Sequence, residues 1–135
     1  MPNITELIKN DKRMMTLNRG VNASGLDKFL RGRGPFTVFA PLNVAFGKLE
    51  KENLEELLMP ESKTQLTALL NQHIIGHRVN FKDLKDGDKL KTLNGKELSV
   101  KIKDGKVSID GAVIRNPDIQ TSNGVIHSLD AVLKN

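Results

Sequence analysis

The segment 34–46, Gly-Pro-Phe-Thr-Val-Phe-Ala-Pro-Leu-Asn-Val-Ala-Phe, decides how this chain folds. Its residues 36–40 are rich in aromatic and β-branched side chains and carry no charge, a composition typical of a buried strand. Pro41 ends that strand, because proline has no backbone N–H to donate to a neighbour. Asn43 is a favoured N-cap residue and predicts a short helix directly after the strand.

The residues before this segment predict helices. Apolar side chains recur at helical spacing in three stretches, 4–8, 14–21 and 26–30. Gly20 and Gly25 interrupt the pattern, so we expect two or three short helices and not one long one. Glycine and proline over 31–35 then predict a turn between the helices and the strand.

The residues after the segment predict further helices. Asn53 can cap a short helical piece, and Ser62 with Gln65 has the spacing of a capping box. The helix that this box opens carries apolar side chains on one side as far as His73, and Gly76 ends it.

The last third of the chain predicts strands. Apolar and polar residues alternate over 98–103 and again over 107–109, and Asp104-Gly105 between them predicts a hairpin turn. Segment 125–133 is apolar on both parities, as expected of a strand that is covered on both faces. Helices that come first and strands that mostly follow predict an α+β fold.

The composition excludes several classes of protein. Of the 135 residues, 38% are hydrophobic and 27% are charged, which excludes an intrinsically disordered chain. Cysteine is absent, which excludes a disulfide scaffold, a thiolate metal site and a cysteine nucleophile. No apolar run approaches the length of a membrane span, and no apolar segment near Met1 predicts a secretory signal. With five Phe and no Trp or Tyr there are few stacking surfaces, so we expect no nucleic-acid partner.

The histidines are the candidates for a metal site. His73 and His77 have the spacing of zinc-protease ligands, with His127 as a third ligand. However, no Glu lies between the first two, and Gly76 interrupts the helix, so we expect no metal. We interpret His73 as a buried ring that hydrogen-bonds through both nitrogens, with Asn43 as one partner. His127 is interpreted as a packed strand residue.

The motifs of common enzymes are absent. The chain has no Gly-x-Ser-x-Gly and no phosphate-binding glycine loop. Strand alternation places His127 on the face opposite to Ser128 and Asp130, which separates the groups that a hydrolytic triad needs. We therefore expect no catalytic activity and no cofactor.

Three segments of the chain together resemble the fasciclin domain family. They are residues 34–46, Leu-Leu-Asn-Gln-His-Ile-Ile at 69–75, and Asn-Gly-Val-Ile-His-Ser-Leu-Asp-Ala-Val-Leu at 123–133. In order and spacing they are similar to the two conserved blocks and the intervening histidine motif of that family. The resemblance covers residues 3–133. It implies one fasciclin-like domain, residues 1–135, in which a β-strand wedge is packed against several helices.

The resemblance also implies a function. Fasciclin domains are typically secreted or cell-surface adhesion modules that bind a protein receptor or a matrix polysaccharide, without catalysis or cofactor. An extracellular, cell-surface or periplasmic location is therefore implied. The absence of cysteine and of a Tyr-His pair suggests a stand-alone bacterial member.

Two motifs of animal fasciclin members mark candidate partner contacts. One is a Tyr-His pair with aliphatic neighbours, in which this chain has Gln72 in place of the tyrosine. The other is an Asp-Ile pair just before the last conserved block. The matching residues are His73, Ile74, Ile75, Asp118 and Ile119. Ordinary turn chemistry is the alternative interpretation of the Asn-Pro-Asp run at 116–118.

The basic residues offer a second kind of site. The net charge of +5 favours acidic partners. Strand alternation and the hairpin turn bring Lys101, Lys103 and Lys106 together. The alternative function is therefore that of an acidic-polysaccharide-binding or matrix-structural protein that uses this face. A second basic cluster comprises Lys28, Arg31 and Arg33. The alternative interpretation is that the lysines only solvate the sheet and discourage pairing at its edge.

Overall fold

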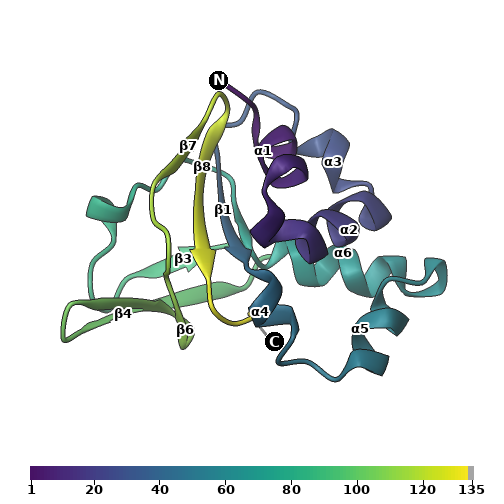
Figure 1. Ribbon diagram of the computed structural model, residues 1–135. Helices are drawn as coiled ribbons and strands as arrows, with labels where there is room; N and C mark the ends of the chain where they lie inside the picture. The colour runs from purple at the N-terminus through teal and green to yellow at the C-terminus, as the bar shows by residue number, and fades with distance from the viewer. Residues whose placement is uncertain (134–135) are drawn as a thin grey trace.

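The computed structural model describes residues 1–133, and Figure 1 shows the order of its elements along the chain. The α-helices are α1 (Ile4–Asn10), α2 (Met15–Ser24), α3 (Leu26–Phe29), α4 (Asn43–Phe46), α5 (Lys51–Leu57) and α6 (Lys63–Asn71). The short 3-10 helices are η1 (Lys12–Met14), η2 (Pro60–Ser62) and η3 (Phe81–Asp83). The strands are β1 (Phe36–Pro41), β2 (Ile74–Ile75), β3 (Lys89–Lys91), β4 (Glu97–Lys103), β5 (Lys106–Ile109), β6 (Ala112–Val113), β7 (Ile119–Thr121) and β8 (Gly124–Leu129).

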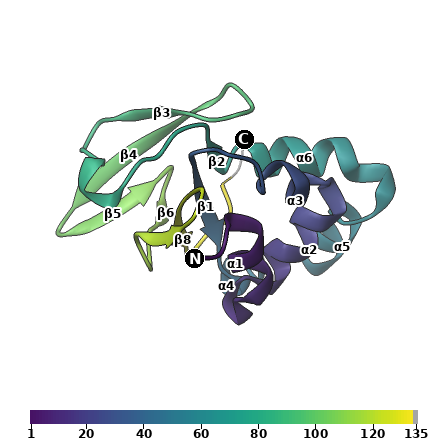
Figure 2. The same cartoon turned by 90° about the horizontal axis from the view of Figure 1, so that it is seen from above.

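The strands form two four-stranded sheets, with the orders β2-β1-β8-β7 and β3-β4-β5-β6. Strands β1 and β8 run parallel, with Val38 opposite Ile126, and the other pairs are antiparallel. Ile114, just after β6, bridges to Leu129 in β8 and so joins the sheets. Figure 2 shows the helices on one side of β1 and β8 and the second sheet on the other side. The predicted α+β class and the wedge of strands are confirmed.

Strand β1 is buried on both faces and therefore contributes to two cores. Val38 and Ala40 belong to the core shared with the helices, whereas Phe39 belongs to the core of the second sheet. Strand β8 divides in the same way, with Ile126 on the helix side and Leu129 on the side of the second sheet. This double burial explains why both strands are apolar on both parities.

Gly20 does not interrupt a helix, contrary to the expectation. Helix α2 continues through it, and the glycine is buried there. A Cβ at Gly20 would lie 3.6 Å from a methyl group of Leu70 and 3.7 Å from one of Leu66, so α6 packs closely at this point. Tertiary packing thus outweighs the low helix propensity of glycine. Gly25 does end α2, as predicted, in the left-handed conformation with φ of 82°.

Asn43 is not an N-cap, so that expectation is wrong. Leu42, whose backbone is extended, is the N-cap of α4 and has no polar side chain to offer. The Asn43 side chain instead reaches the junction of η1 and α2. Its Oδ1 accepts from the Thr16 N–H at 3.1 Å, and its Nδ2 donates to the Lys12 carbonyl at 2.7 Å. Asn43 therefore fixes α4 against the N-terminal helices.

The other two predicted caps also differ. Glu50, with an extended backbone, is the N-cap of α5, and Asn53 lies inside that helix. Ser62 is the N-cap of α6 but makes no side-chain hydrogen bond to it. Its φ of −98° and ψ of 10° continue the preceding η2, so the hydroxyl is not in the extended geometry that capping requires.

Candidate functional site

His73 lies between α6 and β2 and is 1% exposed. Its Nε2 accepts from the Leu133 N–H at 2.9 Å, so its Nδ1–H donates to the Leu69 carbonyl at 2.8 Å. Burial lowers the pKa of His73 to about 4, and the ring is neutral near pH 7. The interpretation as a buried ring with two bonded nitrogens is confirmed. The predicted hydrogen bond to Asn43 is wrong, because both ring nitrogens are bonded to backbone groups.

His127 is also buried, on the side of β8 that faces the second sheet. Its Nδ1 accepts from the Asp118 N–H at 3.1 Å, so its Nε2–H donates to the Val79 carbonyl at 2.8 Å. The ring stacks on Phe39 with 5.6 Å between centroids. Burial lowers the pKa of His127, although the Val79 bond and the Asp118 charge oppose this. His127 is thus a packed residue that positions the 116–119 turn, as its interpretation requires.

The polar groups that could serve catalysis are separated and used in the fold. Ser128 donates its hydroxyl to the Asn116 side chain at 2.9 Å, on the face opposite to His127. Asp130 accepts from the Val113 N–H at 2.9 Å and pairs with Arg115 at 3.1 Å. Within residues 1–133, no three or more His, Cys, Asp and Glu side chains lie close enough to hold a metal ion.

Ile74 and Ile75 are buried, with 2% and 0% exposure. Strand β2 pairs with β1 and packs one isoleucine into each of the two cores. The expectation that His73, Ile74 and Ile75 contact a partner therefore needs correction. Their side chains form the interior of the protein and are not accessible from its surface.

Asp118 and Ile119 lie in the turn from 116 to 119, which leads from β6 into β7 and is called the Asp118 turn below. Asp118 is exposed and has a φ of 55°. Its Oδ1 accepts from the Phe81 N–H at 2.9 Å, while its own N–H donates to His127. Ile119 is half-buried against the helix-side core. The Asp118 carboxylate is thus held in place while it faces solvent.

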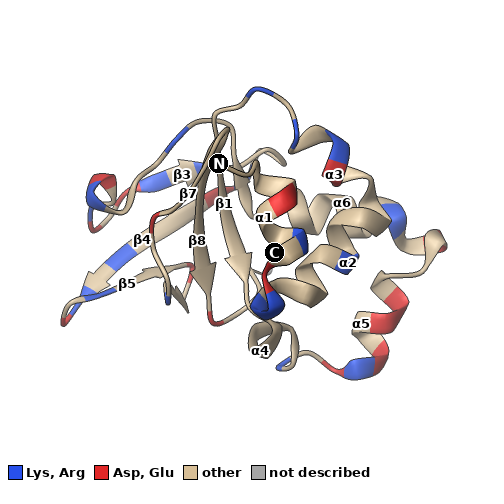
Figure 3. Ribbon diagram, turned by 45° about the horizontal axis from the view of Figure 1, so that its top comes forward, with Lys and Arg blue, Asp and Glu red and all other residues tan. Residues whose placement is uncertain are grey.

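The second sheet is rich in lysine, and Figure 3 shows basic residues in blue along β3, β4 and β5. Lys103 pairs directly with Lys106 across the β4–β5 hairpin, and Lys101 pairs with Ser108. These three lysines line a hollow of about 390 Å³. The predicted grouping of Lys101, Lys103 and Lys106 is therefore present in the structure.

Strand β3 adds two lysines that the sequence analysis missed. Lys89 lies opposite Ser99 and Lys91 lies opposite Glu97. Both lysines therefore lie on the same face of the sheet as Lys101. The alternation Lys-Leu-Lys at 89–91 was the available signal. We call the five residues Lys89, Lys91, Lys101, Lys103 and Lys106 the lysine face.

Nearby carboxylates do not neutralise the lysine face fully. Asp86 accepts from the Ile102 N–H at 2.8 Å, and Asp110 accepts from the Ser99 N–H at 2.7 Å. Both carboxylates thus bond backbone groups at the margin of the sheet. Glu97, opposite Lys91, lies on the face itself, and Asp104 lines the same hollow as Lys101, Lys103 and Lys106. The face therefore keeps an excess of positive charge.

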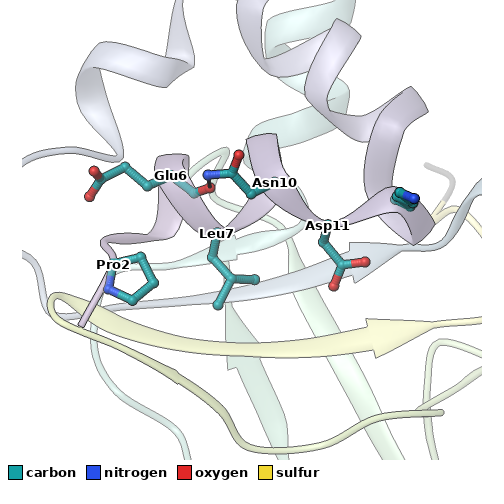
Figure 4. Close-up of a pocket in the computed structure, with 6 residues that line it drawn as sticks. Pro2, Glu6, Leu7, Asn10 and Asp11 are labelled. Carbon is teal, nitrogen blue, oxygen red and sulfur yellow. Dashed lines mark hydrogen bonds between the residues drawn. The ribbon is translucent and has the colours of Figure 1, made fainter.

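A shallow hollow of about 330 Å³ runs beside α1. Figure 4 shows Leu7 and Asp11 on the side of α1 toward the strands, and Glu6 and Asn10 along the rest of the helix. The Arg13 guanidinium pairs with Asp11 at 2.9 Å, and this hydrogen bond lowers the pKa of Asp11. A carboxylate that is ionised and already paired is poorly suited to abstract a proton.

The comparison with known families agrees with this geometry. The family model of the Fasciclin domain matches residues 12–135. The chain belongs to the fasciclin family. The resemblance found in the sequence is thus confirmed.

Relatives of this fasciclin chain occur in bacteria and animals. Protein sll1483 of Synechocystis is 38% identical over 130 residues, which are 96% of this chain and 72% of that protein. Transforming growth factor-beta-induced protein ig-h3 of Sus scrofa is 38% identical over 133 residues, which are 97% of this chain but 19% of the relative. Human Stabilin-1 is 34% identical over 113 residues, which are 81% of this chain and 4% of that protein.

A solved structure shares the fold of this fasciclin chain. It is a FAS1 domain pair from the insect cell adhesion molecule Fasciclin I, with a TM-score of 0.89 and 20% identity. The match covers 99% of this chain and 51% of that one, about one domain of the pair. No helix within residues 1–133 of the fasciclin chain is long and apolar enough to cross a membrane.

Proposed function

We propose that this chain is a non-catalytic adhesion module, one fasciclin domain over residues 1–135 that binds a cell-surface protein or a matrix component outside the cell. Membership of the fasciclin family supports this role, as does the shared fold with a domain pair from a cell adhesion molecule. The interior supports it too, because both buried histidines are neutral and bonded to backbone groups.

The Asp118 turn is the protein-contact surface in this proposal, and its rigid presentation is the observation that carries it. His127 holds the Asp118 N–H, and η3 donates its Phe81 N–H to the Asp118 carboxylate. Arg13 and Ser128 both donate to the Asn116 side chain, at 3.1 and 2.9 Å. A turn that is already ordered loses little conformational entropy when a partner binds it. The exposed Asp118 carboxylate and the adjoining Ile119 offer a charge and an apolar surface.

Adhesion of cells to immobilised protein tests this proposal. Asp118→Asn keeps an oxygen acceptor for Phe81 and tolerates the positive φ, but removes the charge. We expect adhesion to fall by roughly fivefold or more, which corresponds to about 1 kcal/mol of binding energy. Asp104→Asn is the matched control, because Asp104 is also exposed, with a φ of 53°, and lies in the hairpin turn. Equal adhesion of both variants would contradict the Asp118 turn as the contact surface. No adhesion of the unaltered chain would contradict the adhesion function itself.

A second candidate function, binding of an acidic polysaccharide, is favoured by the lysine face. Five lysines on one face of a sheet present a regular array to a linear polyanion, with alternate residues of one strand spaced by about 7 Å. Retention on immobilised heparin tests it. Lys101→Glu/Lys103→Glu should elute at clearly lower salt than Lys51→Glu/Lys63→Glu, a control with the same net charge and exposed positions on α5 and α6. Identical elution of the two variants would contradict a specific face.

A further inference from the structure

A hollow of about 390 Å³ lies between η1 and α4 and is lined by Lys12, Arg13, Leu42, Asn43 and Val44. We call it the Val44 hollow. Val44 is 66% exposed, since it is on the outer side of α4 while Ala45 and Phe46 are buried. Met15, which begins α2 directly after η1, is 60% exposed. The exposed Val44 side chain thus lines the hollow, and a second exposed apolar side chain, Met15, follows the lining residue Arg13 two positions along the chain.

The walls of the Val44 hollow are fixed to each other. Asn43 links α4 to the other wall through its bonds to Thr16 and to the Lys12 carbonyl, at 3.1 and 2.7 Å. The Arg13 guanidinium is also held, by Asp11 at 2.9 Å and by the Asn116 side chain at 3.1 Å. The shape of the hollow is therefore present before any partner arrives, which reduces the entropy lost on binding.

The charges around the hollow are positive. No carboxylate lines it within residues 1–133, and the two charged side chains that do are Lys12 and Arg13. Asp11 already pairs with Arg13, whereas Lys12 has no ion pair among the described residues. Lys48, two residues beyond α4, is a further cation, and its ammonium donates to the Asp130 carbonyl at 2.7 Å. An incoming carboxylate would therefore find Lys12 available.

We propose that the Val44 hollow is a docking site for a segment of a partner protein that carries an apolar side chain flanked by carboxylates. The apolar side chain fills the space between Leu42 and Val44, and a carboxylate pairs with Lys12. Because Arg13 bonds Asn116, the hollow adjoins the Asp118 turn, and one partner can contact both. This inference rests on the proposed adhesion function, for which it names the chemistry of the partner.

Nuclear magnetic resonance titration of the full chain with the acetylated, amidated peptide Ser-Glu-Leu-Glu-Ser tests the docking site. We expect saturable shifts in the amide signals of residues 12–16 and 42–44. Replacement of both glutamates in the peptide by glutamine, or of its leucine by glycine, should each weaken binding by roughly fivefold or more. Shifts elsewhere only, equal binding of the glutamine peptide, or shifts that depend on protein concentration without peptide would overturn the proposal.

Variants of the chain complete the test. Lys12→Gln and Val44→Ser alter exposed side chains, and each should weaken binding of the peptide by roughly fivefold. Met59→Ser is the control, since Met59 is 51% exposed but lies between α5 and η2. Cell adhesion by the same variants separates the two proposals. If the unaltered chain adheres but the peptide does not bind, only the docking site fails; if the peptide binds but cells do not adhere, only the adhesion function fails.

Discussion

Single buried polar side chains connect segments that are far apart in this sequence. Asn123 is 7% exposed, and its Oδ1 accepts from the Ile4 N–H at 3.0 Å. Its Nδ2 donates to the carbonyls of Leu30 and Gly32, at 2.7 and 2.8 Å. One side chain thus ties the start of β8 to α1 and to the turn that follows α3. The sequence marked Asn123 only as part of a conserved block, because its partners are backbone groups about 90 or more residues away.

Asn123→Ala should destabilise the fold by about 3 kcal/mol, since it leaves several buried backbone groups without a partner. The free energy of unfolding in urea measures this effect. Asn22→Ala, at an exposed position of α2, is the control and should change stability by less than about 0.5 kcal/mol. A loss of similar size in both variants would mean that Asn123 is not a structural link.

Acid should destabilise the folded state through the buried histidines. The folded pKa of His73 is about 4 against an ordinary value of 6.5, so the unfolded chain binds more protons between these values. Stability is therefore full above pH 6.5 and falls as the pH falls toward 4, by about 2 kcal/mol at pH 5 from His73 alone. The lowered pKa of His127 acts in the same direction.

Urea unfolding at pH 7 and pH 5 measures the loss, and ring signals in nuclear magnetic resonance report the titration of His73 itself. His77→Gln alters the exposed histidine and should leave the loss unchanged. A His73 ring that titrates near its ordinary pKa in the folded protein would contradict the account.

At the scale of elements, the parallel pair β1–β8 organises the fold. The sequence predicted both strands, since each carries apolar residues on both parities, and it predicted the β4–β5 hairpin from alternation around Asp104-Gly105. It missed β2, which lies at the end of a predicted helix, because two residues are too few to show a period. It also missed the N-caps Leu42 and Glu50, because caps depend on the backbone geometry of the preceding turn.

Gly124→Ala should separate β8 from β1. A Cβ at Gly124 would collide with the Phe36 carbonyl and lie 2.9 Å from a methyl group of Ile4. We expect a loss of about 3 kcal/mol, because backbone must move on both sides. Gly76→Ala is the control, since its Cβ would meet only Leu93 at 3.5 Å and should cost less than about 1 kcal/mol. Thermal unfolding compares the two, and equal melting temperatures would contradict the tight pairing.

At the scale of the whole molecule, the two halves serve different purposes. The interior buries the histidine-motif residues His73, Ile74 and Ile75, and the Asp118 turn and the Val44 hollow lie at the surface. The second sheet presents the lysine face on its outer side. The sequence predicted the fold class and the hairpin lysines. It could not predict that motif residues are buried, because that depends on the pairing of distant strands. The alternation at Lys89 and Lys91 was visible, but three residues are too few to establish a strand.

The central claim, adhesion through a folded protein surface, is tested most directly with coated beads. Beads that carry the chain are allowed to bind cells at low salt and again at about 0.5 M salt, where exposed charges more than a few ångströms apart are screened. The account predicts that the chain binds cells far better than albumin-coated beads, and that a large part of this adhesion persists at high salt and is lost in Asp118→Asn. Adhesion no greater than that of albumin at either salt concentration would contradict it.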